Sequence, residues 1–147
     1  MVQSSAGKNL IIIMRPTGLI IRLLICLSMK YTSYKELLEF ALDETDTFSL
    51  VWRNFKFESS AFELIENLQP WLVSDYSSSS WPGTELFGEK ARVKTYKVNP
   101  QTIEILNCVD SVFDWQAPKY PEDLAFYKGK EVLFSSVAHE GDAWFTN

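Results

Sequence analysis

Residues 121–145, PEDLAFYKGKEVLFSSVAHEGDAWF, contain the clearest structural signal in the chain. An apolar run at 124–127 and a longer one at 131–138 flank Gly129, and glycine supplies the positive φ that a tight hairpin turn needs. Both faces of the second run are mostly apolar, which favours a central pair of strands over an edge. We therefore predict a β-hairpin here.

Two further features are expected within this stretch. At the start of the second strand one face is directed to the core, and further along the strand the opposite face is. The change falls near Ser135 and Ser136, so we expect a β-bulge there. Residues 143–145 follow a polar turn, and their apolar side chains predict a last short strand. Together these signals make the C-terminal hairpin the centre of the predicted sheet.

Helix signals occur upstream of the hairpin. Ser33 and Glu36 have the spacing of a capping box, in which each side chain accepts a hydrogen bond at the start of a helix. The apolar spacing that follows predicts a helix over 34–43. Asn99 before a proline is a further helix start, and it predicts a helix over 102–109.

A second capping-box pattern lies between these two helices. Ser60 and Glu63 have the same spacing as the first pair. Phe62 and Leu68 belong to the apolar face of the helix that follows, and Pro70 ends it. This pattern predicts a second amphipathic helix.

Strand signals separate the helices. Alternating apolar and polar residues predict strands at 48–53 and 92–98, and 71–76 is a weaker candidate. The order of elements indicates an α+β fold: a single domain with a mainly antiparallel sheet, about three helices and the C-terminal hairpin. A hydrophobic content of 46% and an aromatic content of 14% exclude a disordered chain.

The chain is acidic, with a formal net charge of −5. All nineteen acids follow Met29, since residues 1–29 contain three basic residues and no acid. A nucleic-acid or anionic-membrane partner needs a basic surface, so we expect neither. An acidic surface steers a basic protein partner toward the chain, although it serves solubility equally well.

Residues 1–28 differ from the rest. Arg15 and Arg22 interrupt the apolar runs, so neither run approaches the roughly 18–20 residues of a membrane span. One interpretation is a weak signal or surface anchor, and the other is an upstream extension with the natural start at Met29. We expect the second: 1–28 as a non-domain extension or flexible tail, and 29–147 as a single α+β domain.

Two cysteines, Cys26 and Cys108, do not make a disulfide framework, which indicates a reducing compartment and a cytoplasmic location. Cys108 has apolar neighbours, so we expect it to be a small buried hydrophobe.

His139 is the only histidine and thus the only possible imidazole base. Ser135 and Ser136 lie on one predicted strand close to it in sequence, so neither forms a positioned Ser–His pair. No Gly-x-Ser-x-Gly motif is present. The commoner role of such a histidine is to cap a backbone group in a loop, and we predict no catalytic residue.

A metal site would need His139 together with Glu140 and Asp142, and with Glu122 or Asp123. One histidine without paired cysteines does not fit zinc, and the spacing matches no calcium loop. A carboxylate pair such as Glu122 and Glu140 is a weak hydrolase signal in a chain with nineteen acids. We predict no metal and no cofactor.

Trp81 lies in a Ser-rich loop and is followed by Pro82, Gly83 and Thr84. A tryptophan in such a loop either folds back to staple it or is an exposed interface anchor, and stapling is the commoner case because exposed tryptophans reduce solubility. The remaining tryptophans considered have apolar neighbours and are expected in the core: Trp52, Trp71 and Trp115.

The acids at the two ends of the hairpin region are expected to meet at one rim of the sheet. Rigid strands would hold these loops in place, as in many binding sites, although exposed acids are also ordinary solvated groups. The residues predicted to bind a partner are Trp81, Thr84, Glu122, Asp123, His139, Glu140 and Asp142.

Three motifs, WPGT at 81–84, PEDL at 121–124 and SVAHE at 136–140, resemble a group of uncharacterised short bacterial proteins, over about residues 48–145. That group has no assigned activity, so no site residue is carried over.

In size and charge the chain is also similar to immunity proteins that accompany secreted toxins. We expect a cytosolic protein-binding domain that neutralises a basic toxin domain. The alternatives are a hydrolase-like enzyme using His139 and nearby carboxylates, and a scaffold without a ligand; the oligomeric state is left open.

Overall fold

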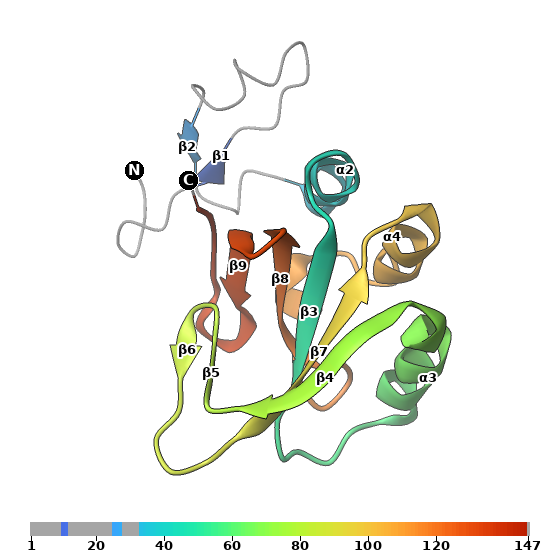
Figure 1. The fold of residues 1–147 in the computed structure, drawn as a ribbon, viewed down its shortest axis with the longest axis vertical. Coiled ribbons are helices and arrows are strands. Elements are labelled where there is room, and N and C mark those ends of the chain that lie inside the picture. Colours follow the sequence, from blue (N-terminus) through green and yellow to red (C-terminus); the bar gives the residue numbers. More distant parts are fainter. Residues whose placement is uncertain (1–9, 12–24, 28–32, 147) are drawn as a thin grey trace.

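The computed structural model describes residues 10–11, 25–27 and 33–146. Within these residues, a six-stranded antiparallel sheet has the order β10-β9-β8-β3-β7-β4 and three α-helices pack on one face (Figure 1). This confirms the predicted α+β class. The strands of the sheet are β3 (Thr47–Trp52), β4 (Leu72–Ser78), β7 (Ala91–Lys97), β8 (Glu122–Lys128), β9 (Glu131–Val137) and β10 (Asp142–Phe145). The helices are α2 (Tyr34–Glu44), α3 (Ser59–Leu68) and α4 (Pro100–Leu106).

Shorter elements join these. A two-stranded hairpin, β5 (Ser80–Trp81) and β6 (Thr84–Glu85), connects β4 to β7. Single 3-10 turns are η2 (Gln69–Trp71), η3 (Val112–Asp114) and η4 (Ala138–Glu140). The strands β1 (Leu10–Ile11) and β2 (Ile25–Leu27) pair antiparallel, and β1 contacts β10. Most of the predicted extension, residues 1–28, lies outside the described residues.

The caps predicted for two helices are confirmed, although α4 spans Pro100–Leu106 rather than the predicted 102–109. The Ser33 side chain accepts from the Glu36 backbone N–H at 3.0 Å, and the Glu36 side chain accepts in return from the Ser33 N–H at 3.0 Å. Asn99 and Thr102 form the same reciprocal pair at the start of α4. These caps satisfy backbone donors that a helix leaves unpaired at its first turn.

The capping box predicted at Ser60 and Glu63 is wrong. Helix α3 begins two residues earlier than this box predicts, with Glu58 as its N-cap and no side-chain cap. The Ser60 hydroxyl instead donates to the Lys119 carbonyl oxygen at 2.7 Å, so a tertiary contact replaces the local one. Phe62, expected on the buried face, is 56% exposed.

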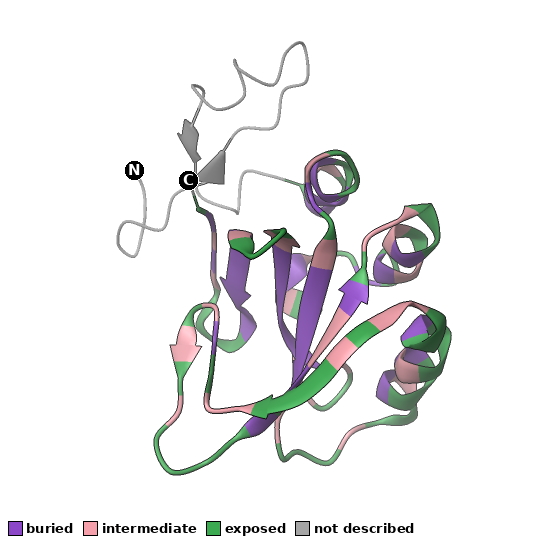
Figure 2. Ribbon diagram, in the orientation of Figure 1, coloured by how far each residue is buried: buried purple, intermediate pink, exposed green. Residues whose placement is uncertain are grey.

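The core lies between the helices and the sheet. Phe48, Phe126 and Phe134 on neighbouring strands form a row of rings with centroids 6.1 Å apart, and all three are fully buried. Trp115 is also fully buried, and its indole N–H donates to the Tyr34 hydroxyl at 3.0 Å. Figure 2 shows β3, β8 and β9 as largely buried and the edge strand β4 as largely exposed.

The C-terminal hairpin is central, as predicted, and Gly129 takes a φ of 60° in its turn. Its bulge, however, is not at the two serines. Phe126 pairs with Phe134 whereas Tyr127 pairs with Val132, so Leu133 is the extra residue.

Ser135 and Ser136 stay in register with β10. The buried Ser136 hydroxyl donates to the Leu124 carbonyl oxygen at 2.7 Å, so a hydrogen bond within the sheet removes the reason for a bulge there. The predicted last strand is confirmed as β10.

The β5–β6 hairpin covers part of the other face of the sheet. Trp81 packs there with Val51 and Val93, and this explains why β3 is buried on both faces rather than alternating. Gly83 has a φ of 90°, and a Cβ at this position would lie 2.8 Å from side-chain atoms of Val137 and Trp144. Only glycine therefore allows the hairpin to sit this close to β9 and β10.

Two expectations about single residues need correction. Cys108 is exposed rather than buried, and it follows the end of α4 at Leu106. Trp71 is only partly buried, whereas Trp52 and Trp115 are in the interior as predicted. Among the described residues, no helix is long and apolar enough to span a membrane.

Candidate functional site

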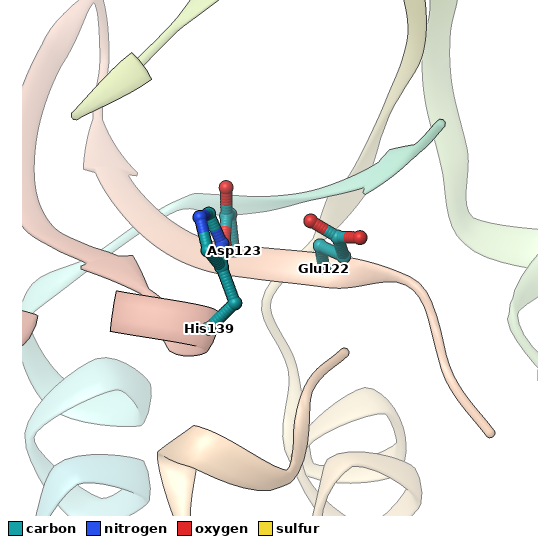
Figure 3. Close-up of side chains that lie close together, drawn as sticks. All are labelled: Glu122, Asp123 and His139. Atoms are coloured by element: carbon teal, nitrogen blue, oxygen red, sulfur yellow. The ribbon is translucent and has the colours of Figure 1, made fainter. Parts of the chain in front are cut away.

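A β-bulge at the start of β8 creates the site. Ser49 of β3 pairs with Ala125, but Val51 pairs with Glu122, so β8 has one extra residue in this interval. Asp123 absorbs it with a φ of 59°, a left-handed conformation that aspartate tolerates better than most residues. The bulge breaks the alternation of the strand and re-aims two consecutive carboxyl groups. Figure 3 shows Glu122 and Asp123 on the same side of β8.

Hydrogen bonds from two distant segments hold the Asp123 carboxylate. The Trp81 indole N–H donates to Oδ2 at 2.9 Å, and the Ala138 backbone N–H donates to Oδ1 at 3.1 Å. Asp123 is 2% exposed, and burial raises the pKa of its carboxyl while these two hydrogen bonds lower it. The carboxylate thus ties the β5–β6 hairpin and the η4 turn to β8.

Glu122 has no comparable support. It is 4% exposed, and its Oε1 atom is buried without a hydrogen-bond partner among the described residues. Burial raises the pKa of this carboxyl, and the charge of Asp123 raises it further, whereas the charges of Arg53 and His139 lower it. A buried acceptor without a donor is costly, so it marks a position that a ligand can satisfy.

His139 completes the cluster from the η4 turn. One ligand atom each of Glu122, Asp123 and His139 lie within 4.8 Å of one another (Figure 3). The His139 side chain is 48% exposed, and its Nε2 lies 3.7 Å from Oε2 of the exposed Glu140. The left-handed Gly141 that follows, at a φ of 71°, ends the turn and sends the chain into β10. The imidazole therefore lies between two buried carboxyls and solvent.

A pocket of about 400 Å³ opens beside this cluster. Glu122 and His139 line one part of it. The segment after β3 contributes Arg53, Phe55 and Lys56, and residues 116–118 contribute a third wall. Arg53 lies over the Phe55 ring at 5.7 Å from its centroid. Acidic, basic and aromatic groups thus meet in one concave region.

The structure divides the predicted binding residues into two groups. Trp81 is 7% exposed and staples its loop, so it is not an exposed interface anchor. Glu122 and Asp123 are likewise buried, so they do not belong to a solvated acidic rim, because the bulge turns them inward. The remaining predicted residues are exposed or partly exposed: Thr84, His139, Glu140 and Asp142.

Arg53, Phe55 and the segment 116–118 were missed. Their sequence signal is faint, since it consists of polar and aromatic residues just after a predicted strand and a Pro-containing linker. Comparison with protein-family models finds no match, and neither the curated proteins nor the solved structures include a significant match to the chain.

The unpartnered carboxyl leads to a prediction about pH and stability. A carboxyl whose folded pKa is raised destabilises the fold as pH rises from its ordinary value of 4.5 through the folded pKa. Glu122→Gln should therefore raise the free energy of unfolding at pH 7 by roughly 1–3 kcal/mol, and the gain should vanish near pH 4. Urea unfolding at both pH values, in a buffer that contains a metal chelator, measures this.

Glu131→Gln, at the exposed far end of β9, is the matched control and should change little at either pH. A loss of stability in Glu122→Gln at pH 7 would show that the native carboxylate is already well satisfied.

Proposed function

We propose that the chain is an acidic protein-binding domain that recognises its partner at the mouth of the Glu122 pocket. The observation that carries this proposal is the exposure of Phe55, 48%, directly beside Arg53 at the pocket. Aromatic residues and arginine are enriched at the centres of protein interfaces, where they account for much of the binding energy. An aromatic ring left half exposed next to a concave surface is suited to such a contact.

Charge supports a basic partner. The chain has a net charge of −5, and the Glu140 side chain, next to the pocket residue His139, is 59% exposed. The net negative charge of the chain steers a positively charged protein toward it. On size and charge, the finer proposal is an immunity protein that neutralises a basic toxin domain in the bacterial cytoplasm.

Site-specific photo-crosslinking tests the interface. A photoreactive phenylalanine analogue replaces Phe55 in cells of the source organism, and the same analogue replaces Phe62 as the control. Phe62 is 56% exposed on α3 and does not line the pocket. The proposal expects one discrete adduct from position 55 and none from position 62. Equal adducts from both positions, or none from position 55, would overturn it.

Association with the captured partner should depend on the exposed Glu140 and the partly exposed Asp142. In Glu140→Gln combined with Asp142→Asn, we expect the association rate at low salt to fall several-fold, because rim charges act mainly on encounter. The difference should shrink at 0.15 M salt, where the Debye length is about 8 Å. Stopped-flow measurements at the two salt concentrations check this. An unchanged rate at low salt would place the interface elsewhere.

A hydrolase-like enzyme is the second candidate. One observation favours it: the fold brings the imidazole of His139 beside two buried carboxyls in a pocket. A carboxyl with a raised pKa next to an imidazole is a common acid–base arrangement. A panel of activated esters and phosphoesters tests this candidate. Turnover lost in His139→Ala would support it, and absence of turnover across the panel would exclude it for these substrate classes.

A further inference from the structure

We propose that Glu122, Asp123 and His139 form a binding site for one divalent transition-metal ion, with Zn²⁺ as the best-fitting class. Their ligand atoms lie within 4.8 Å of one another. Zinc ligands lie about 2.0–2.2 Å from the ion, so ligand atoms around one ion are about 3–4 Å apart. The His139 side chain is 48% exposed, and we expect a change of its rotamer to close the difference.

The unpartnered oxygen of Glu122 is the observation that points to an ion rather than to three unrelated side chains. Glu122 is 4% exposed, and its Oε1 atom has no hydrogen-bond partner among the described residues. A buried carboxylate oxygen lacks the donors that water would supply. A cation shared with Asp123 would satisfy this oxygen and would also offset the repulsion between the two adjacent carboxylates.

Asp123 is held as a metal ligand usually is. The Trp81 indole N–H and the Ala138 N–H each donate to one of its oxygens, at 2.9 and 3.1 Å. Outer-shell donors of this kind fix the orientation of a ligating carboxylate, and each oxygen keeps a second lone pair for the ion. The left-handed backbone at Asp123, with a φ of 59°, places it beside Glu122. A strained conformation is often retained where it serves a site.

The donor set selects the class of ion. Calcium and magnesium take oxygen ligands in larger numbers, whereas an imidazole nitrogen with two carboxylates suits zinc and related ions. Three protein ligands leave a coordination position open in a zinc site. His139 and Glu122 also line the pocket of about 400 Å³. The open coordination position of the ion is therefore accessible from this pocket. The expectation of no metal rested on the single histidine, on the lack of paired cysteines and on a spacing that matches no calcium loop.

Arg53 is the competing influence. It lines the same pocket, and its charge lowers the pKa of both carboxyls. No ion pair within 4.0 Å joins it to either carboxylate in the part of the chain that the structure describes. The oxygens are therefore not occupied by the guanidinium. The inference does not depend on the proposed partner, since it concerns binding of the ion alone.

The test is titration of the full-length chain with Zn²⁺, followed by calorimetry, and with Co²⁺, followed by its visible absorption. Cys26 and Cys108 are replaced by serine so that thiolates do not compete. We expect one ion per chain. Loss of an outer-shell partner typically weakens metal binding roughly 10–100-fold. Glu122→Gln and His139→Ala each remove a ligand of the ion, so each should weaken binding by more than this. Trp81→Phe, which removes only such a partner, should weaken it about 10-fold.

Glu131→Gln is the matched control, because it removes an exposed carboxylate at the opposite end of β9 and should bind the ion normally. His139→Ala should also change the Co²⁺ spectrum, which a purely structural role would not do. Circular dichroism checks that each variant is folded. Absence of saturable binding up to millimolar Zn²⁺ would overturn the proposal. Binding that survives both Glu122→Gln and His139→Ala would overturn it equally.

Discussion

Phe126→Ala should lower the free energy of unfolding by about 3–5 kcal/mol. Phe126 is fully buried between Phe48 and Phe134, with ring centroids 6.1 Å from each. Truncation removes the apolar contacts of the ring and leaves a cavity at the centre of the sheet, where β8 is fixed by strands on both sides. A loss of this size is a large part of the roughly 5–15 kcal/mol that stabilises a typical domain.

Urea unfolding followed by circular dichroism measures the effect. Phe62→Ala is the matched control, because it removes the same kind of side chain from an exposed position. The Phe62 ring is 56% exposed on α3, so its removal should lower the free energy of unfolding by at most about 0.5 kcal/mol. Similar losses in the two variants would contradict the placement of β8 at the centre of the sheet.

Trp81→Ala should destabilise the chain by a similar amount, about 3–5 kcal/mol. The indole is 7% exposed, and it packs on Val51 and Val93 between the β5–β6 hairpin and the sheet. Its removal also deprives the buried Asp123 carboxylate of a donor at 2.9 Å. The penalty therefore combines a cavity with the loss of one of the two hydrogen bonds to a buried carboxyl group.

Trp81→Phe separates these two contributions. It keeps most of the ring volume but removes the donor, so the expected loss is roughly 1–3 kcal/mol. Chemical unfolding gives both values, and hydrogen exchange at Ala138, whose N–H also binds Asp123, reports on the local site. A Trp81→Ala loss below about 1 kcal/mol would mean that the hairpin is not stapled to the sheet.

The local elements of this fold were predictable because their causes lie within a few residues. The capping pairs at the starts of α2 and α4 are local hydrogen bonds, and the Gly129 turn needs only one left-handed residue. Where a distant partner competes, the same reasoning failed. Ser60 has the right spacing for a cap, but its hydroxyl bonds to Lys119 instead.

The candidate site was only partly predictable. The residues of the site could be predicted, since Glu122, Asp123 and His139 all belong to the predicted binding region. The burial of Glu122 and Asp123 could not be predicted, because it depends on a bulge opposite β3 and on a tryptophan 42 residues away in sequence. Arg53 and Phe55, on the other wall of the pocket, have no local pattern that marks them.

By itself, then, the sequence determined the helices, most of the strands, the central hairpin and the α+β class. These follow from periodicity, capping and turn chemistry, which act over short distances along the chain. The tertiary structure decided which polar groups lose contact with water. The pairing of β8 with β3 buries Glu122 without a partner and Asp123 with two. Burial depends on the register between strands far apart in sequence, and no local pattern encodes that register at a bulge.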